Sequence, residues 1–229
     1  MSARSEEKNA YYYSAMIVSY MFHPIFIPSY LFITFYYYGK FVFHPLKDLT
    51  QFYVVLLLIV TTAIIPLIML FFYMILNKRK MSSSDIFMDN SRERFVPFLY
   101  TGIFYSALTY ILFTELHFPL IIIYYLSIIS ISVLAVACIS LFWKISAHAI
   151  SMGAALIMFA LTYTVLPDED FFNVILVTFF ISGLVLSSRL YLNAHKPSQV
   201  YIGYLLGIII GACGLYELIP NILHISFPF

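Results

Sequence analysis

Seven stretches of almost uninterrupted apolar residues run through this 229-residue chain, and each is about as long as a helix that crosses a lipid bilayer. They are apolar on most faces, which separates spans from helices that lie on a membrane surface. With 62% hydrophobic and only 10% charged residues, the chain has too little polar surface to cover a water-soluble globule. The stretches are residues 13–38, 51–77, 97–114, 119–142, 147–166, 171–189 and 198–216.

The sequence therefore predicts an all-α fold, a polytopic transmembrane helical bundle of six or seven spans that forms a single domain over residues 1–229. Pro24 and Pro28 interrupt the first stretch and are expected to kink its helix, because proline lacks the amide hydrogen. The same composition excludes a disordered chain, a nucleic-acid-binding protein and a disulfide scaffold. No small-residue cleavage site follows the first stretch, so we expect it to be retained as a span.

The polar connections differ in charge on the two sides of the predicted membrane. If all seven stretches cross, the N-terminus and the connections 78–96, 143–148 and 189–197 lie on one face, because two crossings separate each from the next. That face holds ten of the 12 Lys and Arg residues. Because basic connections favour the cytoplasm, the count predicts a multi-pass membrane protein with its basic face in the cytoplasm. We expect the membrane to be a bacterial inner membrane.

The basic face gathers ionisable side chains at span ends, where facing lipid is costly and lining a site is usual. Arginine and lysine together with histidine suit a pocket for an anion, most naturally a phosphate. His195 and Gln199 share a helix face if the turn continues. Pro197 suits the first turn of a helix, whose free N–H groups would point at the anion. The clustered residues are Arg92, Arg94, Lys144, His148, Arg189, His195 and Lys196.

Three segments of the basic face resemble the signatures of type 2 phosphatidic acid phosphatases. Ser188–Arg189, five residues and then His195 resemble the third signature, Ser-Arg, five residues, His, three residues, Asp. Residues 144–148, Lys-Ile-Ser-Ala-His, are similar to the second, Pro-Ser-Gly-His. Residues 92–97, Arg-Glu-Arg-Phe-Val-Pro, are similar to the first, a Lys with a distant Arg-Pro. The segments occur in the family's order, and the resemblance covers about residues 85–211.

The resemblance implies an integral membrane lipid phosphatase that uses no metal ion or other cofactor. It implies that His195 is the nucleophile that forms a phosphohistidine, and that His148 is the general acid that protonates the leaving oxygen. Phosphoryl transfer needs mainly positioning and charge stabilisation, and a histidine that titrates near neutrality can attack phosphorus or give a proton. The residues implied to hold the phosphoryl oxygens are Arg189, Lys144, Ser146 and Arg92 or Arg94.

Two positions depart from the family's signatures. Gln199 stands where the family has Asp, and its oxygen can accept the Nδ1 hydrogen of the histidine but adds no charge. If the amide group faced the ring instead, it would enforce the wrong tautomer, a change that costs a Ser-His-Asp triad about 10⁴ in rate. Ala147 stands where the family has Gly, and it would cost about 1 kcal/mol if that position required a positive φ.

Several functions stay open at this point. The implied substrate is a lipid phosphomonoester or pyrophosphate whose chain lies among the spans, in contact with membrane lipids. A phosphohistidine can also pass its phosphoryl group to an acceptor other than water, as in a phosphotransferase. A catalytically impaired protein that only binds lipid phosphates is the alternative that Gln199 favours. A transporter would place polar residues deep inside spans, whereas here they gather at one end.

Glycine recurs at every fourth residue of the last stretch, a pattern that lets another helix approach closely. We expect this face to pack within the chain rather than in a homodimer, although a homodimer stays possible. The three glycines are Gly203, Gly207 and Gly211. The histidines outside the signatures are expected to be structural, and these are His23, His44, His117 and His224.

Overall fold

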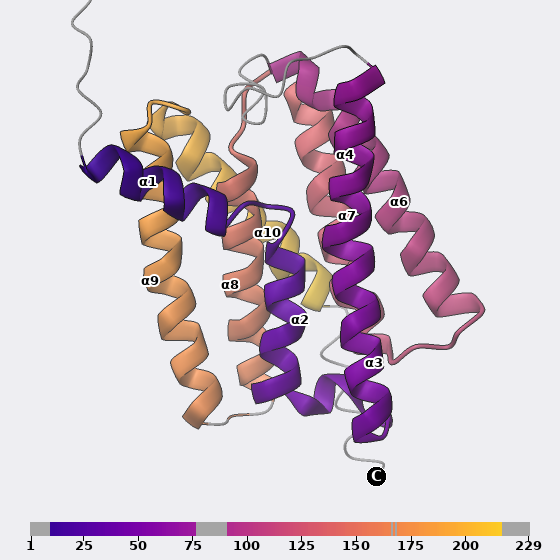
Figure 1. Ribbon diagram of the computed structural model, residues 1–229. Coiled ribbons are helices and arrows are strands. Elements are labelled where there is room, and N and C mark those ends of the chain that lie inside the picture. Colours follow the sequence, from indigo (N-terminus) through magenta and orange to yellow (C-terminus); the bar gives the residue numbers. More distant parts are fainter. Residues whose placement is uncertain (1–9, 77–90, 166, 168, 217–229) are drawn as a thin grey trace, which may run out of the picture.

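The computed structural model describes residues 10–76, 91–165, 167 and 169–216, and every regular element in this part of the chain is helical. Figure 1 shows a bundle of long helices with the first helix lying across one end. Within the described residues, six helices are long and apolar enough to cross a membrane. This confirms the predicted all-α, multi-pass membrane fold. The six are Asp48–Leu76, Phe95–Thr114, Leu120–Ser140, Ala147–Thr164, Asp170–Tyr191 and Pro197–Gly214.

The long helices follow the predicted stretches to within a few residues. Helices of about 20 residues are about 30 Å long, which matches the hydrocarbon core of a bilayer. The second stretch forms α3 (Asp48–Ile59), a π-helical turn η2 (Val60–Ile64) and α4 (Ile65–Leu76) in one continuous rod. The remaining helices are α6 (Phe95–Thr114), α7 (Leu120–Ser140), α8 (Ala147–Val165), α9 (Glu169–Tyr191) and α10 (Pro197–Tyr216).

The first stretch is not the single kinked span that the sequence predicted. It forms α1 (Ala10–Met21) and α2 (Ile27–Tyr38), of 12 residues each, or about 18 Å of helix. Pro24 lies in the connector, and Pro28 lies in the first turn of α2, where a missing N–H removes no helical hydrogen bond. The prolines therefore end one helix and begin another. As a result α1 lies across α9 while α2 runs along the bundle, toward the 3-10 helix η1 (Lys40–Phe43).

The three signature segments meet at one end of the bundle, which we call the basic end. They are the connections that precede α8 and α10 and the short 3-10 helix η3 (Ser91–Arg94) that precedes α6. The backbone N–H of Ser146 donates to the carbonyl of Gln199 at 3.3 Å. Nη1 of Arg94 donates to the carbonyl of Ile145 at 3.5 Å. Hydrogen bonds thus join segments that are about 50 residues apart in the chain.

An aromatic cluster packs the opposite end of the bundle. Phe35 stacks on Tyr125 with ring centroids 4.8 Å apart, and Phe159 and Phe171 pack around it. All four side chains are buried. Offset and edge-on aromatic contacts of this kind add stability beyond the area that they bury. The rigid part of the core therefore lies away from the basic end, where polar side chains and a cavity are found.

A proline in the middle of the rod Asp48–Leu76 is accommodated by a tyrosine from α6. Pro66 has no N–H to donate to the carbonyl of Thr62, four residues earlier, and its ring crowds that carbonyl. The π-helical turn η2 widens the helix at this point. The hydroxyl of the buried Tyr105 donates to the carbonyl of Thr62 at 2.6 Å. The carbonyl that proline leaves without a donor is thus satisfied by another helix.

Tyr105→Phe is expected to destabilise the protein by about 1 kcal/mol, because it leaves the buried carbonyl of Thr62 without this donor. The expected fall in the midpoint of thermal unfolding in detergent is about 2–4 °C. Tyr110→Phe is the control, since Tyr110 lies on the same helix and is exposed. Equal midpoints for the two variants would contradict this role of Tyr105.

The glycine face of α10 packs against α8 within the same chain. A Cβ added at Gly207 would lie 2.1 Å from the carbonyl oxygen of Ile150. A Cβ added at Gly153 on α8 would lie 2.2 Å from the carbonyl oxygen of Tyr204. Neither position has room for a side chain, so the close approach requires glycine. The structure thus places this face inside the molecule rather than at a dimer seam.

Gly207→Ala is expected to destabilise the protein by about 3 kcal/mol or more, because the added methyl group pushes two backbones apart. Gly183→Ala is the matched control, since a Cβ there meets no atom within 4 Å. Removing that glycine from a helix interior is expected to be neutral or to stabilise by up to about 1 kcal/mol. Thermal unfolding of both variants measures the difference, and equal stabilities would contradict the tight packing of α8 on α10.

Candidate functional site

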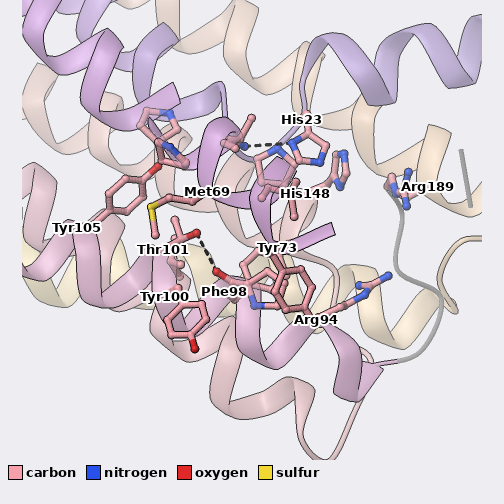
Figure 2. A pocket seen from close by; sticks show the side chains of 18 of the residues that line it. His23, Met69, Tyr73, Arg94, Phe98, Tyr100, Thr101, Tyr105, His148 and Arg189 are labelled. Carbon is pink, nitrogen blue, oxygen red and sulfur yellow. Dashed lines mark hydrogen bonds between the residues drawn. The ribbon is translucent and has the colours of Figure 1, made fainter. Parts of the chain in front are cut away.

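A cavity of about 130 Å³ lies at the basic end. An engineered cavity of about 150 Å³ holds a benzene molecule, so this cavity has room for a phosphate group. It is bounded by the connector between α1 and α2, by α4 and α6, and by the adjoining ends of α8 and α9 (Figure 2). The basic and imidazole side chains that line it are His23, Arg94, His148, Arg189 and His195.

The turn after α9 sets the separation of Arg189 and His195. Helix α9 ends at Tyr191, and Asn193 has a φ of 52°, a left-handed conformation that asparagine tolerates well. The N–H of Ala194 donates to the carbonyl of Arg189, and the N–H of Asn193 donates to that of Leu190. This pair of bonds is the Schellman motif of helix ends. The five residues between Arg189 and His195 thus form the end of α9 and the turn that follows it.

Gln199 connects His195 to the start of α10. Its Oε1 accepts the backbone N–H of Lys196 at 3.0 Å, as a glutamine three residues after an N-cap residue does in a capping box. The same Oε1 lies 3.2 Å from Nδ1 of His195. His195 precedes the helix, so the two residues meet through the cap and not, as the sequence predicted, through a shared helix face.

This geometry decides the tautomer of His195. A backbone N–H only donates, so the atom that accepts the Lys196 N–H must be the oxygen of the Gln199 amide. The oxygen therefore also faces the ring, and Nδ1 of His195 carries the hydrogen. The lone pair is then on Nε2, which has no hydrogen-bond partner among the described residues. Gln199 thus gives the tautomer that an aspartate would give.

The surroundings of His195 keep its ring neutral. Burial lowers the pKa of His195 to about 3, and the positive charges of Arg94, Arg189 and Lys144 contribute further to the lowering. The hydrogen bond with Gln199 acts in the opposite direction, since it favours the protonated ring. The unprotonated ring is therefore the form present near neutral pH, and it faces a cluster of positive charge.

His148 is oriented by α1. It is the second residue of α8 and is buried, and its Nε2 lies 3.1 Å from the backbone carbonyl of Ser19. Because a carbonyl only accepts, Nε2 carries the hydrogen and Nδ1 is the atom left for chemistry. The hydroxyl of Ser19 also accepts a hydrogen bond from Nη1 of Arg189 at 3.3 Å. The end of α1 therefore holds two residues of the site.

Both cavity-lining arginines are buried, with 2% of Arg189 and 5% of Arg94 exposed. Buried guanidinium groups are costly to desolvate, and they are favoured where a planar, charged fork binds an oxyanion. Lys144 is half-buried and does not line the cavity, although its charge acts on His195. Arg92 lies on η3, and its side chain is outside the described part of the structure.

Two other predicted positions have plain structural explanations. The hydroxyl of Ser146 accepts the N–H of Ala149 at 3.4 Å, as the N-cap residue of α8 does. Ser146 is fully buried and is not among the residues that line the cavity, so its phosphate contact stays a prediction. Ala147 is the first residue of α8, and its φ is not positive. Alanine in place of the family's glycine therefore costs no backbone strain here.

Sequence reasoning missed two residues of the site, Ser19 and His23. Both belong to the first apolar stretch, which bears no signature, and the sequence predicted a structural role for His23. The sequence feature that could have indicated His23 is its position next to Pro24, in an apolar stretch that Pro28 interrupts again. His44 and His117 are exposed and do not line the cavity, and His224 lies outside the described residues.

The described residues include no group of three His, Cys, Asp or Glu side chains that could hold a metal ion. Comparison with models of known protein families, with curated proteins and with solved structures finds no match to this chain. The functional argument therefore depends on the residues and geometry of the cavity.

Proposed function

We propose that this protein is an integral membrane lipid phosphatase that hydrolyses a lipid phosphomonoester or pyrophosphate through a phosphohistidine at His195. The observation that carries the proposal is the tautomer of this residue, which leaves Nε2 unprotonated, together with the place of His195 in the lining of a cavity that has room for a phosphate group. Arg94 and Arg189 line the same cavity. The resemblance to type 2 phosphatidic acid phosphatases supports the same reaction, in which these residues hold the phosphoryl oxygens.

The reaction uses the two histidines in sequence. Nε2 of His195 attacks phosphorus, and the bond between phosphorus and the leaving oxygen breaks. The negative charge of the bound phosphate favours protonation of Nδ1 of His148. His148 then gives this hydrogen to the leaving oxygen, while its Nε2–H stays on the carbonyl of Ser19. Water then attacks the phosphohistidine, His148 takes the proton of the water, and phosphate leaves with His195 regenerated. Negative charge on the equatorial oxygens is offset by Arg94 and Arg189.

The apolar wall of the cavity supports a lipid substrate. Side chains from α4 and α6 form this wall, and the same two helices expose large apolar side chains on their outer faces. A phosphate group at the basic end would therefore leave its hydrocarbon chain between these helices, within the bilayer. The wall residues from α4 and α6 include Pro66, Met69, Leu70, Phe98, Tyr100 and Thr101.

The site is proposed to face the cytoplasm of a bacterial inner membrane. The basis is the charge distribution, since the basic end carries most of the Lys and Arg residues. Tags on the two ends of the chain test the orientation in intact cells. An N-terminal tag that is accessible only after lysis agrees with the proposal, and one that is accessible from outside contradicts it.

The proposed activity is tested by phosphate release from a panel of lipid phosphates in detergent, with and without a chelator. The panel contains a phosphatidic acid, a phosphatidylglycerol phosphate, a polyprenyl phosphate and a polyprenyl pyrophosphate. We expect chelator-resistant release from at least one of them. Folded protein that binds inorganic phosphate but releases none from the panel would favour the binding-only alternative, and transfer of phosphate to a second lipid would favour a phosphotransferase.

Variants at Gln199 separate an active site from an impaired one. Gln199→Leu is expected to lower kcat by about 10²–10⁴, because Nδ1 of His195 loses the partner that fixes its tautomer. Gln199→Glu keeps the reach of the side chain and adds a charge that raises the pKa of His195. Its activity should stay within about tenfold of wild type, with the acid limb of the pH profile moved to higher pH. Activity of Gln199→Leu equal to wild type would contradict this role.

A further inference from the structure

A third histidine lines the cavity from outside the three signature segments. His23 lies in the connector between α1 and α2, four residues after Ser19. Its ring meets that of His148 edge-on, with centroids 5.4 Å apart at an angle of 84°. Figure 2 shows the two rings side by side, near Arg189. The first stretch of the chain thus contributes a side chain to the cavity, in addition to the Ser19 contacts.

The tautomer of His23 follows from its backbone neighbour. The N–H of Ile25 lies 3.4 Å from Nδ1 of His23, and a backbone N–H only donates. Nδ1 is therefore the acceptor, and the hydrogen of the neutral ring is on Nε2. No hydrogen bond of Nε2 is found among the described residues. His23 is thus a neutral donor with an unused N–H in the cavity that Arg94 and Arg189 also line.

The packing of His23 on His148 places it beside the proposed general acid. Burial and, to a smaller extent, the charge of Arg189 lower the pKa of His23 to about 4. Arg94 and Lys144 act on His195 and are not among the causes for His23. The phosphoryl group attacked by His195 would lie among the positive charges that act on this histidine, those of Arg94, Arg189 and Lys144. His23 and His148 would then lie on the side where the leaving oxygen departs.

We propose that His23 contacts the substrate directly, with its Nε2–H donating a hydrogen bond to the leaving oxygen that His148 protonates. This inference rests on the proposed phosphatase function. The leaving oxygen gains negative charge as its bond to phosphorus breaks, so the hydrogen bond is stronger in the transition state than in the bound substrate. A neutral imidazole can donate such a hydrogen bond without losing its proton. In triosephosphate isomerase, a neutral histidine polarises the substrate in this way.

The test compares two substrates that share a phosphoryl group and differ in the leaving group. One is a long-chain alkyl phosphate, whose leaving oxygen must be protonated to depart as an alcohol. The other is a nitrophenyl phosphate with a similar chain, whose leaving group departs as a stable phenolate. His23→Leu removes the donor, and His23→Gln keeps an N–H near the position of Nε2. His44→Leu is the control, since His44 is exposed and directly follows η1, at the end of α2 away from His23.

We expect His23→Leu to lower kcat for the alkyl phosphate about tenfold to a hundredfold, the range carried by one hydrogen bond to a charged group. The loss for the nitrophenyl phosphate should stay below about threefold, and His23→Gln should recover most of the alkyl activity. Equal losses on both substrates, or no loss, would overturn the inference and leave the phosphatase proposal intact. No release by wild-type protein from either substrate would overturn both.

Discussion

His195→Ala is expected to abolish phosphate release, with a loss of kcat of about 10⁴-fold or more. The reason is that Nε2 of His195 forms the covalent bond to phosphorus, and among the described histidines only His195 has the charges of both Arg94 and Arg189 acting on it. Enzymes that lose their nucleophile retain only the catalysis that binding and charge stabilisation provide. The measurement is phosphate release at saturating substrate, with unfolding midpoints recorded in parallel.

The covalent intermediate is a second measurement on the same variant. Wild-type protein mixed with a substrate carrying labelled phosphate should retain label that is lost in acid and kept in base, as expected of a phosphohistidine. His195→Ala should retain none, whereas His44→Ala should behave as wild type because His44 is exposed and lies far from the basic end. A kcat of His195→Ala equal to that of wild type would contradict the phosphohistidine mechanism.

Arg189→Leu is expected to lower kcat/KM by about 10³-fold, because the arginine stabilises charge that develops on the phosphoryl oxygens. Arg189 is 2% exposed, and its charge reaches His23 and His195. Removing the charge should raise the pKa of both histidines, since a nearby positive charge disfavours their protonation. Arg189→Lys should recover part of the activity, because it keeps the charge and loses the two-pronged contact.

Stability separates this catalytic role from a structural one. Arg189→Leu removes a hydrogen bond to Ser19 and also the cost of desolvating a buried charge. If Arg189 serves catalysis, the midpoint of thermal unfolding should change little relative to the thousandfold loss of kcat/KM. A large fall of the midpoint with only a small loss of kcat/KM would instead assign Arg189 to the fold.

The long helices were predictable because bilayer thickness sets their length. A run of about 20 apolar residues has few other stable structures in a membrane, so the ends of α6 to α10 fall within a few residues of the predicted ends. The stretch 13–38 was mispredicted because hydropathy alone does not separate one kinked helix from two short ones. That outcome depends on whether α9 offers a surface for α1 to lie on, which is a long-range property.

The parts of the site that form within one short segment of chain were predictable from the sequence. The separation of Arg189 and His195 follows from one helix end, and the place of Gln199 follows from the next helix start. The direction of the Gln199 amide was left open by the sequence, because it depends on a third atom, the N–H of Lys196. The contact of Ser19 with His148 had no signature, because it uses a backbone carbonyl, which is the same in every residue.

The contacts of Ser19 also determine when the site can exist during synthesis of the protein. Ser19 is 129 residues from His148 and 170 residues from Arg189 along the chain. Because a chain is synthesised from its N-terminal side, Ser19 is delivered well before Arg189. His148 and Arg189 then pack onto a segment that has already been synthesised. A nascent chain that stops before α9 has no complete site, so partly synthesised copies cannot act on the lipids around them.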